Sequence, residues 1–350
     1  MQEMISRFVL EGMPIGCVPF GSGHINKTWL VVTNRPHLYV LQNVNTQTFR
    51  DPRGLMRNVI MVTDHIRRKV RDPRQVLQLV PTTDGEKYIL EEDGRLWRMY
   101  EYVTGSICLD MPESTENFRQ AGRAFGAFQQ QLADFPADQL TESIPDFHHT
   151  PKRFEALRRA IDADVMNRAA GVRPEIDFYL AREASAGELI GLLNRGELSL
   201  RVTHNDTKLN NVMLDEKTRE PLCIVDLDTV MPGLAAYDYG DAIRFGASEA
   251  AEDEQDLGKV RLSMDMYRAF TEGFLSVCRD SLNVLERETL ADGARLITLE
   301  CGARFLTDYL QGDTYFHIAR PGHNLDRART QMALVGDMER HWDEMKAILK

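Results

Sequence analysis

The sequence contains no apolar stretch that approaches the ~18 residues needed to cross a bilayer, and residues 1–12 show no basic head followed by an apolar core. Neither a membrane span nor a signal peptide is therefore expected. Cysteine is scarce as well: there are five, an odd number, and none of them form a C-x-x-C pair. This usage predicts the reduced, mostly buried thiols of a cytoplasmic protein.

The sequence also lacks an excess of positive charge. Lys and Arg number 42 against 53 Asp and Glu, which gives a net charge of -11 at pH 7. An acidic surface repels nucleic acid and anionic membranes, so neither is expected as a partner. The same charge repels nucleoside triphosphates, so a nucleotide site would need a metal ion or local basic residues.

β-prone residues dominate the first part of the chain, and helical periodicity dominates the rest. Strands are expected at 29–33, 38–42, 88–90 and 96–103, with one helix at 54–69. Further helices are expected from Pro112 to Leu132 and at 151–170, 174–194, 263–279, 286–311 and 326–349, around an island of strand signals at 198–230. These patterns predict an α+β fold, with a small β-rich lobe over 1–103, a hinge near 101–105 and a larger, mainly helical lobe over 104–350.

The densest pattern of chemically active side chains lies in the β-island. It reads H-x-D-x-x-x-x-N from His204 through Asp206 to Asn211, followed by a short hairpin and an apolar strand that ends in Asp226. Antiparallel arms bring their free ends together. We therefore expect Asn211 and Asp226 side by side, with Asp206 on the loop that feeds the first arm.

This arrangement fits the requirements of phosphoryl transfer. Asp206 would hold and deprotonate the attacking hydroxyl, while Asn211 and Asp226 would hold Mg²⁺ against the phosphates. Each residue alone is better explained as a turn or cap, because Asp and Asn favour such places, but the spacing of the set favours catalysis. Asp228 is open between a further metal ligand and a loop cap, and His204 is predicted to hold the loop by hydrogen bonds.

The segment 204–211, together with 224–226, resembles the catalytic loop and metal-binding Asp of the protein-kinase-like fold in its aminoglycoside phosphotransferase branch. Longer stretches are similar to the N-acetylhexosamine 1-kinases, and they include 21–26, 200–211, 241–248, 300–305, 323–325 and 329–331. The resemblance implies a bilobal fold with a nucleotide-binding lobe over 1–103 and a catalytic and substrate-binding lobe over 104–350. It implies ATP- and Mg²⁺-dependent phosphorylation of N-acetylglucosamine and N-acetylgalactosamine at O1, by a monomer or small homo-oligomer.

With this resemblance, nucleotide contacts are expected from the turn Gly21, Ser22 and Gly23, and from backbone groups of Glu101 and Val103. Without it, a hairpin turn explains the first segment as well as a phosphate-binding loop does, and a plain linker explains the second.

The sugar is expected beside the catalytic loop. The candidate substrate-binding residues are His24, Asn26, Arg304, Asp308 and Tyr315. A surface or capping role is equally open for His24, Asn26 and Asp308, while a functional role is favoured for Arg304 and Tyr315. Asp238 and Asp241 are expected to brace the catalytic loop from a helix N-terminus.

One part of the kinase pattern is absent. Kinases usually carry a Lys late in the third strand, paired to a helix Glu, to hold the α- and β-phosphates. Here the strand ends in Gln42, and the helix at 54–69 has no Glu. Mg²⁺, with Arg57 or Arg98, is expected to supply the missing charge. The absence keeps a nucleotide-binding pseudokinase open, and homoserine, choline or an aminoglycoside is the alternative acceptor.

Overall fold

The computed structural model describes residues 1–21 and 25–350, which divide into two units, each treated by itself. The first unit contains residues 1–108, 134–145 and 211–232, and the second contains 109–133, 146–210 and 233–350. The predicted small lobe ends at residue 103, whereas the first unit also includes the two later segments 134–145 and 211–232. One cause is strand pairing: β6 (Ser106–Ile107) is antiparallel to β8 (Val212–Asp215), which in turn pairs with β9 (Pro221–Ile224).

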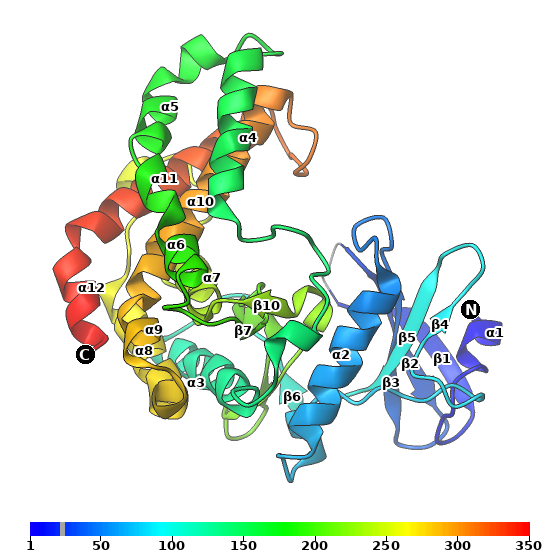
Figure 1. Ribbon diagram of the computed structural model, residues 1–350. Coiled ribbons are helices and arrows are strands. Elements are labelled where there is room, and N and C mark those ends of the chain that lie inside the picture. Colours follow the sequence, from blue (N-terminus) through cyan, green and yellow to red (C-terminus); the bar gives the residue numbers. More distant parts are fainter. Residues whose placement is uncertain (22–24) are drawn as a thin grey trace. The chain divides into compact units, whose positions relative to one another are not determined.

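The described residues of the first unit build a five-stranded antiparallel sheet in the order β1-β2-β3-β5-β4 (Figure 1). Its strands are β1 (Pro14–Pro19), β2 (Lys27–Thr33), β3 (Leu38–Val44), β4 (Ile89–Leu90) and β5 (Leu96–Glu101). The last four of these confirm the predicted strands. β1 was not predicted, because it begins and ends in Pro, and an edge strand is where a sheet tolerates Pro.

Helix α2 (Pro52–Arg67) accompanies this sheet and confirms the predicted helix. It begins where the Asp51 side chain accepts a hydrogen bond from the backbone N of Gly54 at 2.9 Å, with Pro52 in its first turn. Such an N-cap stabilises a helix by about 1 kcal/mol. Its apolar face buries Leu55 and Val59, so the sequence periodicity was read correctly.

The second unit is mainly helical, as predicted, and is organised around the long helix α10 (Figure 1). Helices α4, α7 and α11 all pack against α10. The α-helices of this unit are α3 (Thr115–Gln131), α4 (Thr150–Ala163), α5 (Arg173–Leu180), α6 (Glu188–Asn194), α7 (Ala235–Gly246), α8 (Met264–Cys278), α9 (Val284–Glu288), α10 (Leu290–Gln311), α11 (His323–Arg340) and α12 (Trp342–Ile348). The unit also contains the short strand β7 (Arg201–Thr203), while β10 (Met231–Gly233) begins in the first unit and ends in the second. No helix in the described part of the chain is both long enough and apolar enough to span a membrane.

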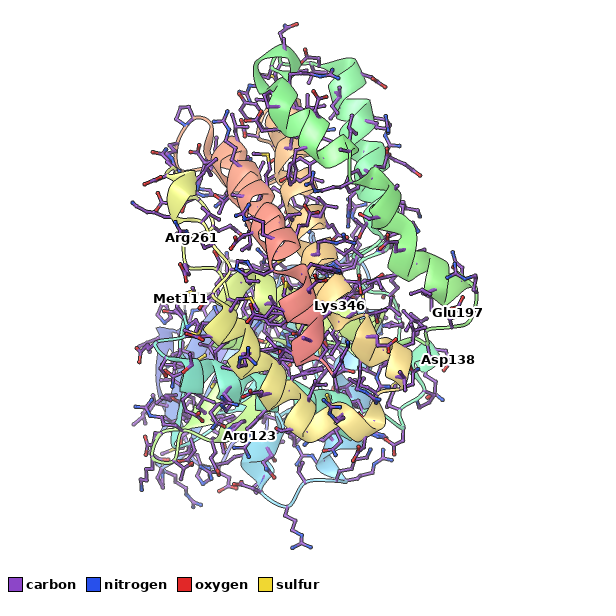
Figure 2. The ribbon with its side chains drawn as sticks, turned by 90° about the vertical axis from the view of Figure 1, so that its left-hand side faces the viewer. Met111, Arg123, Asp138, Glu197, Arg261 and Lys346 are labelled. Carbon is purple, nitrogen blue, oxygen red and sulfur yellow. The ribbon has the colours of Figure 1, made fainter. Side chains whose placement is uncertain are left out.

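Several of these helices are shorter than predicted. The helix expected over 174–194 is wrong as one element, because the small residues of a 3₁₀ turn (Glu183–Gly187) separate α5 from α6. The helix expected over 151–170 ends at Ala163, where Asp164 takes the left-handed conformation with φ 35°. The last predicted helix divides into α11 and α12, and the Lys346 side chain on α12 (Figure 2) donates a hydrogen bond to the Glu288 carbonyl at 2.5 Å.

Helices α3 and α8 approach each other closely because glycines lie at their contact. A Cβ atom added to Gly122 would lie 2.3 Å from the carbonyl oxygen of Phe270, and one added to Gly126 would lie 2.5 Å from that of Phe274. We expect Gly122→Ala to lower the free energy of unfolding by about 1–3 kcal/mol, because backbone atoms cannot yield locally. Urea unfolding of the full chain measures this. Gly171→Ala is the control, since a Cβ there has no neighbour within 4 Å; equal stability of the two variants would contradict the close approach.

Candidate active site

The loop that carries Asp206 is anchored from helix α7. Asp238 on α7 is buried and accepts hydrogen bonds from the backbone N of His204 at 2.9 Å and of Asn205 at 2.8 Å. The side chain of Gln129 donates a third hydrogen bond at 3.0 Å. Burial raises the pKa of Asp238, although these donors oppose the rise. The predicted bracing role of Asp238 is confirmed.

Asp241, one helical turn further along α7, fixes the next part of the same loop. Its carboxylate accepts a hydrogen bond from the backbone N of Thr207 at 2.9 Å and lies 3.1 Å from the guanidinium of Arg244. Burial alone would raise the pKa of Asp241, but the charges of Arg244 and Lys208 outweigh it, and the pKa lies below its usual range. The predicted brace is confirmed here as well.

His204 lies inside the unit and behind the loop. The side chain is fully buried, with ring centroids 5.9 Å from Phe125 and 6.0 Å from Phe128, both on α3. Its Nδ1 accepts a hydrogen bond from the backbone N of Asp206 at 3.3 Å. These contacts support the prediction that His204 holds the loop.

Asp206 itself is paired with a lysine two residues later. The ammonium of Lys208 lies 2.9 Å from the Asp206 carboxylate, and the Asp206 side chain is 28% exposed. Burial lowers the pKa of Lys208, but the carboxylates of Asp206 and Asp241 more than compensate and raise it above its usual value. The loop therefore presents an accessible carboxylate next to a fixed positive charge.

The first unit contains the other two residues of the motif. Val212 on β8 pairs with Ile224 on β9, and the backbone N of Val225 donates to the carbonyl of Asn211 at 2.9 Å. The hairpin thus brings Asn211 and Asp226 to the same end, as its strand pattern predicts. Their role as metal ligands stays a prediction.

Asp226 adopts the left-handed backbone conformation, with φ 57° and ψ 58°. Asp and Asn are the residues other than Gly that enter this region most readily. Two residues later, Asp228 is buried and lies 2.5 Å from the guanidinium of Arg98, a residue of β5. The same guanidinium donates two hydrogen bonds to Oε1 of Gln42, at 2.9 and 2.8 Å.

The donor chemistry of the hairpin end fits a hard divalent cation. An amide oxygen from Asn211 and a carboxylate from Asp226 are oxygen ligands, and Mg²⁺ characteristically takes one or two such groups and completes its shell with phosphate and water. No group of three or more His, Cys, Asp or Glu side chains suited to a metal occurs in residues 1–21 and 25–350.

A model of the phosphotransferase enzyme family matches residues 16–270, well over half of the chain. The chain belongs to the phosphotransferase enzyme family. The fold is the kinase-like fold of the aminoglycoside phosphotransferases, as predicted.

Solved phosphotransferases with this fold cover nearly the whole chain. A microcompartment-associated aminopropanol kinase has 15% identity and a TM-score of 0.61 over 100% of this chain and 98% of its own. An aminoglycoside phosphotransferase from Alicyclobacillus acidocaldarius has 12% identity and a TM-score of 0.62, over 98% and 96%. The amicoumacin kinase hAmiN, in complex with AMP-PNP, Ca²⁺ and Ami, has 14% identity and a TM-score of 0.64, over 95% and 91%.

The predicted phosphate-binding turn of this phosphotransferase is described only in part. Gly21 takes φ +82°, a conformation that favours glycine, while Ser22, Gly23 and His24 lie outside the described residues. Asn26 uses both ends of its amide: Nδ2 donates to Asp228 at 2.6 Å, and Oδ1 accepts from the backbone N of Asn45 at 3.0 Å. These bonds tie Asn26 to the segment that follows Asp226.

The predicted adenine-contacting segment starts at the end of the inner strand β5. Glu101 ends β5 opposite Tyr39, and its backbone N donates to the carbonyl of Gln78 at 2.9 Å. The carbonyl of Val103 accepts a hydrogen bond from the Ser106 hydroxyl at 2.6 Å. The backbone here is well anchored, and its contact with a nucleotide stays a prediction.

In the second unit, Arg304 gathers aromatic rings around its guanidinium. The carbon Cζ lies 5.9 Å from the ring centroid of Tyr315, 5.4 Å from Phe316 and 6.0 Å from Phe147. Tyr315 is 73% exposed, so its ring is available to a ligand. The structure therefore brings together two of the predicted substrate residues, Arg304 and Tyr315.

Asp308 lies beneath this cluster and organises its loop. The buried carboxylate accepts hydrogen bonds from the backbone N of Thr314, Tyr315 and Phe316 at 2.8–2.9 Å, and from the Asn324 side chain at 2.9 Å. Four donors occupy its oxygens, so Asp308 fixes the backbone that carries Tyr315. Its direct contact with substrate stays a prediction.

The sequence motif alone does not identify three of the residues described above. Lys208 is marked only by its spacing from Asp206, two positions later. Phe147 lies in a loop without any recognisable pattern. Arg98 contacts Gln42 and Asp228, which no local pattern indicates, and the choice between Arg57 and Arg98 for the missing positive charge stays open.

Proposed function

We propose that this phosphotransferase transfers the γ-phosphate of ATP to the anomeric hydroxyl of an N-acetylhexosamine, with a divalent cation, Mg²⁺, at the hairpin end. The observation that carries the phosphoryl-transfer part is the pairing of β8 and β9, which aligns Asn211 and Asp226 at one end. AMP-PNP and Ca²⁺ in the amicoumacin kinase complex support a nucleotide and a divalent cation in this fold.

Asp206 would accept the proton of the attacking hydroxyl. An anomeric hydroxyl is more acidic than an ordinary alcohol, so a carboxylate suffices as the base, and such a base typically contributes about 10²–10⁴-fold. Lys208, 2.9 Å away, fixes the carboxylate and adds a positive charge next to the reacting groups. When bound, the divalent cation would neutralise the charge of the β- and γ-phosphate oxygens.

The charge around the aromatic cluster supports a neutral acceptor. Burial lowers the pKa of Arg153, and the positive charge of the Arg304 guanidinium lowers it further. The carboxylate of Glu300 offsets part of the positive charge of the two guanidinium groups. It is already engaged, because it accepts hydrogen bonds from Thr150 at 2.7 Å and from His148 at 3.0 Å. Choline or an aminoglycoside would meet repulsion here, whereas the face of a sugar ring stacks well on Tyr315 and its acetamide accepts from guanidinium groups.

An acceptor panel tests the proposal. ADP release is measured with N-acetylglucosamine, N-acetylgalactosamine, glucose, galactose, choline, homoserine and ethanolamine. We expect kcat/KM for the better N-acetylhexosamine to exceed that for every cationic acceptor by at least about 10²-fold, because a site built to hydrogen-bond its substrate rejects analogues that leave those groups unpaired.

Phosphorus NMR of the product then identifies the phosphorylated oxygen, which should be O1. Turnover confined to choline, homoserine or ethanolamine would replace the sugar with the amino-alcohol alternative. Metal-dependent ATP binding without turnover on any acceptor would favour the pseudokinase.

A further inference from the structure

Arg98 is the largest of the fully buried side chains in the described residues, at 1% exposure. A buried guanidinium is tolerated only when its charge is paired and its N–H groups are hydrogen-bonded. Here Nε and Nη2 both donate to Gln42, which lies directly opposite on β3, and Nη1 faces Asp228 at 2.5 Å. The guanidinium therefore joins two strands of the sheet to the segment after Asp226.

Asp228 is engaged from two sides. Oδ1 faces Arg98, and Oδ2 accepts a hydrogen bond from Asn26 at 2.6 Å. The side chain is 4% exposed, and the residue lies in a single 3₁₀ turn, Leu227–Thr229, that starts directly after Asp226. We name Asn26, Gln42, Arg98 and Asp228 the Arg98 network. All its members belong to the first unit.

Like protein kinases, the network has a buried pair of a cation and a carboxylate, but the two residues belong to different strands and loops from those in protein kinases. A Lys late in strand three and a Glu in the following helix form that pair in protein kinases. In this chain Gln42 occupies the strand position, the cation comes from the neighbouring strand β5, and the carboxylate comes from the segment after Asp226. The pair is thus connected directly to the backbone of the predicted metal ligand.

We propose that the Arg98 network positions Asp226 for the divalent cation, and that Asp228 is a positioning residue and not a metal ligand. The inference rests on the proposed function, because it takes Asp226 as the ligand. Asp226 directly precedes a 3₁₀ turn, and this turn is fixed by the Asp228 side chain, which is paired to Arg98 of the sheet. Outer partners of this kind typically alter metal affinity by about 10–100-fold.

Nucleotide binding tests the network without any acceptor. The affinity for AMP-PNP is measured by calorimetry with Mg²⁺ and with EDTA, and the ratio of the two affinities is the metal enhancement. We expect Arg98→Met and Asp228→Asn each to reduce this enhancement by about 10-fold or more, while the affinity in EDTA changes by less than about 3-fold. Arg95→Met is the control, because Arg95 is 56% exposed and pairs only with surface carboxylates.

A double variant, Arg98→Met with Asp228→Leu, separates positioning from stability. Each single variant leaves one buried charge without its partner and is expected to lower the thermal midpoint, whereas the apolar pair removes both charges and is expected to recover part of that loss. We expect the metal enhancement to stay about 10-fold low in the double variant despite this recovery. Arg98→Lys, which keeps the charge but loses the two-pronged contact with Gln42, is expected to fall between wild type and Arg98→Met.

Three results would overturn the inference. Loss of enhancement in Asp228→Asn but not in Arg98→Met would make Asp228 a direct ligand. Wild-type enhancement in the double variant would make the pair purely structural. No enhancement in the wild-type protein would overturn the proposed function and this inference together, whereas enhancement that persists in every variant would overturn the inference alone.

Discussion

An Asp206→Asn variant is expected to lose about 10²–10⁴-fold in kcat, the usual contribution of a general base, while its affinity for Mg²⁺ and AMP-PNP stays close to that of wild type. The amide keeps the size of the carboxylate and an oxygen that accepts a hydrogen bond from Lys208, so the loop should keep its conformation. Asp238 and Asp241 fix the backbone of that loop from α7 without using the Asp206 side chain. Steady-state ADP release and calorimetric nucleotide binding measure the two quantities separately.

Glu155→Gln is a matched control for this change. Glu155 lies on α4 with 64% exposure, and its carboxylate is 3.9 Å from the guanidinium of Arg159. The substitution removes one negative charge from the surface and should leave kcat within about 2-fold of wild type. Activity of Asp206→Asn within a few-fold of wild type would remove Asp206 from the role of base. Loss of nucleotide affinity in the same variant would instead assign Asp206 a structural role.

The strands and the hairpin of the motif could be predicted because their signals are local. Short runs of β-prone residues in β2 and β3, with an Asn-Arg-Pro turn between them, need no distant contact to be recognised. The same holds for β8 and β9, whose pairing alone determines that Asn211 and Asp226 share one end. The bracing role of Asp238 and Asp241 followed from their place in a helix beside the loop.

The Arg98 network could not be predicted in the same way, because its members are distant in sequence. Asn26 and Asp228 are separated by 202 positions, and nothing in the local sequence of Asp228 indicates a partner on β5. Gln42 was noticed only as the absence of a lysine. Two helix ends were also missed. The 3₁₀ turn at Glu183–Gly187 interrupts one predicted helix, and the left-handed Asp164 ends another.

An Asp226→Asn variant is expected to lose nearly all of the metal enhancement of nucleotide binding, and about 10²–10⁴-fold in kcat, since charge stabilisation by a bound cation supplies several kcal/mol. Asn is the informative replacement because residue 226 has φ 57°, a conformation that Asn adopts readily and that Ala would strain. Asp164→Asn, at a φ of 35° in the second unit, is the control for loss of a carboxylate from left-handed backbone, and it should bind nucleotide as wild type does.

The same experiment separates charge from fold at position 226. If Asp226 is the anionic ligand, wild type in EDTA and Asp226→Asn in Mg²⁺ should bind AMP-PNP with affinities that agree within about 3-fold, because each lacks the cation and retains every other contact. In Mg²⁺, the affinity of Asn211→Ala should lie between that of wild type and that of Asp226→Asn, since this change removes a neutral oxygen and leaves the carboxylate. A variant at 226 that kept its response to Mg²⁺ would show that the cation is held elsewhere, and the hairpin end would then not be the metal site.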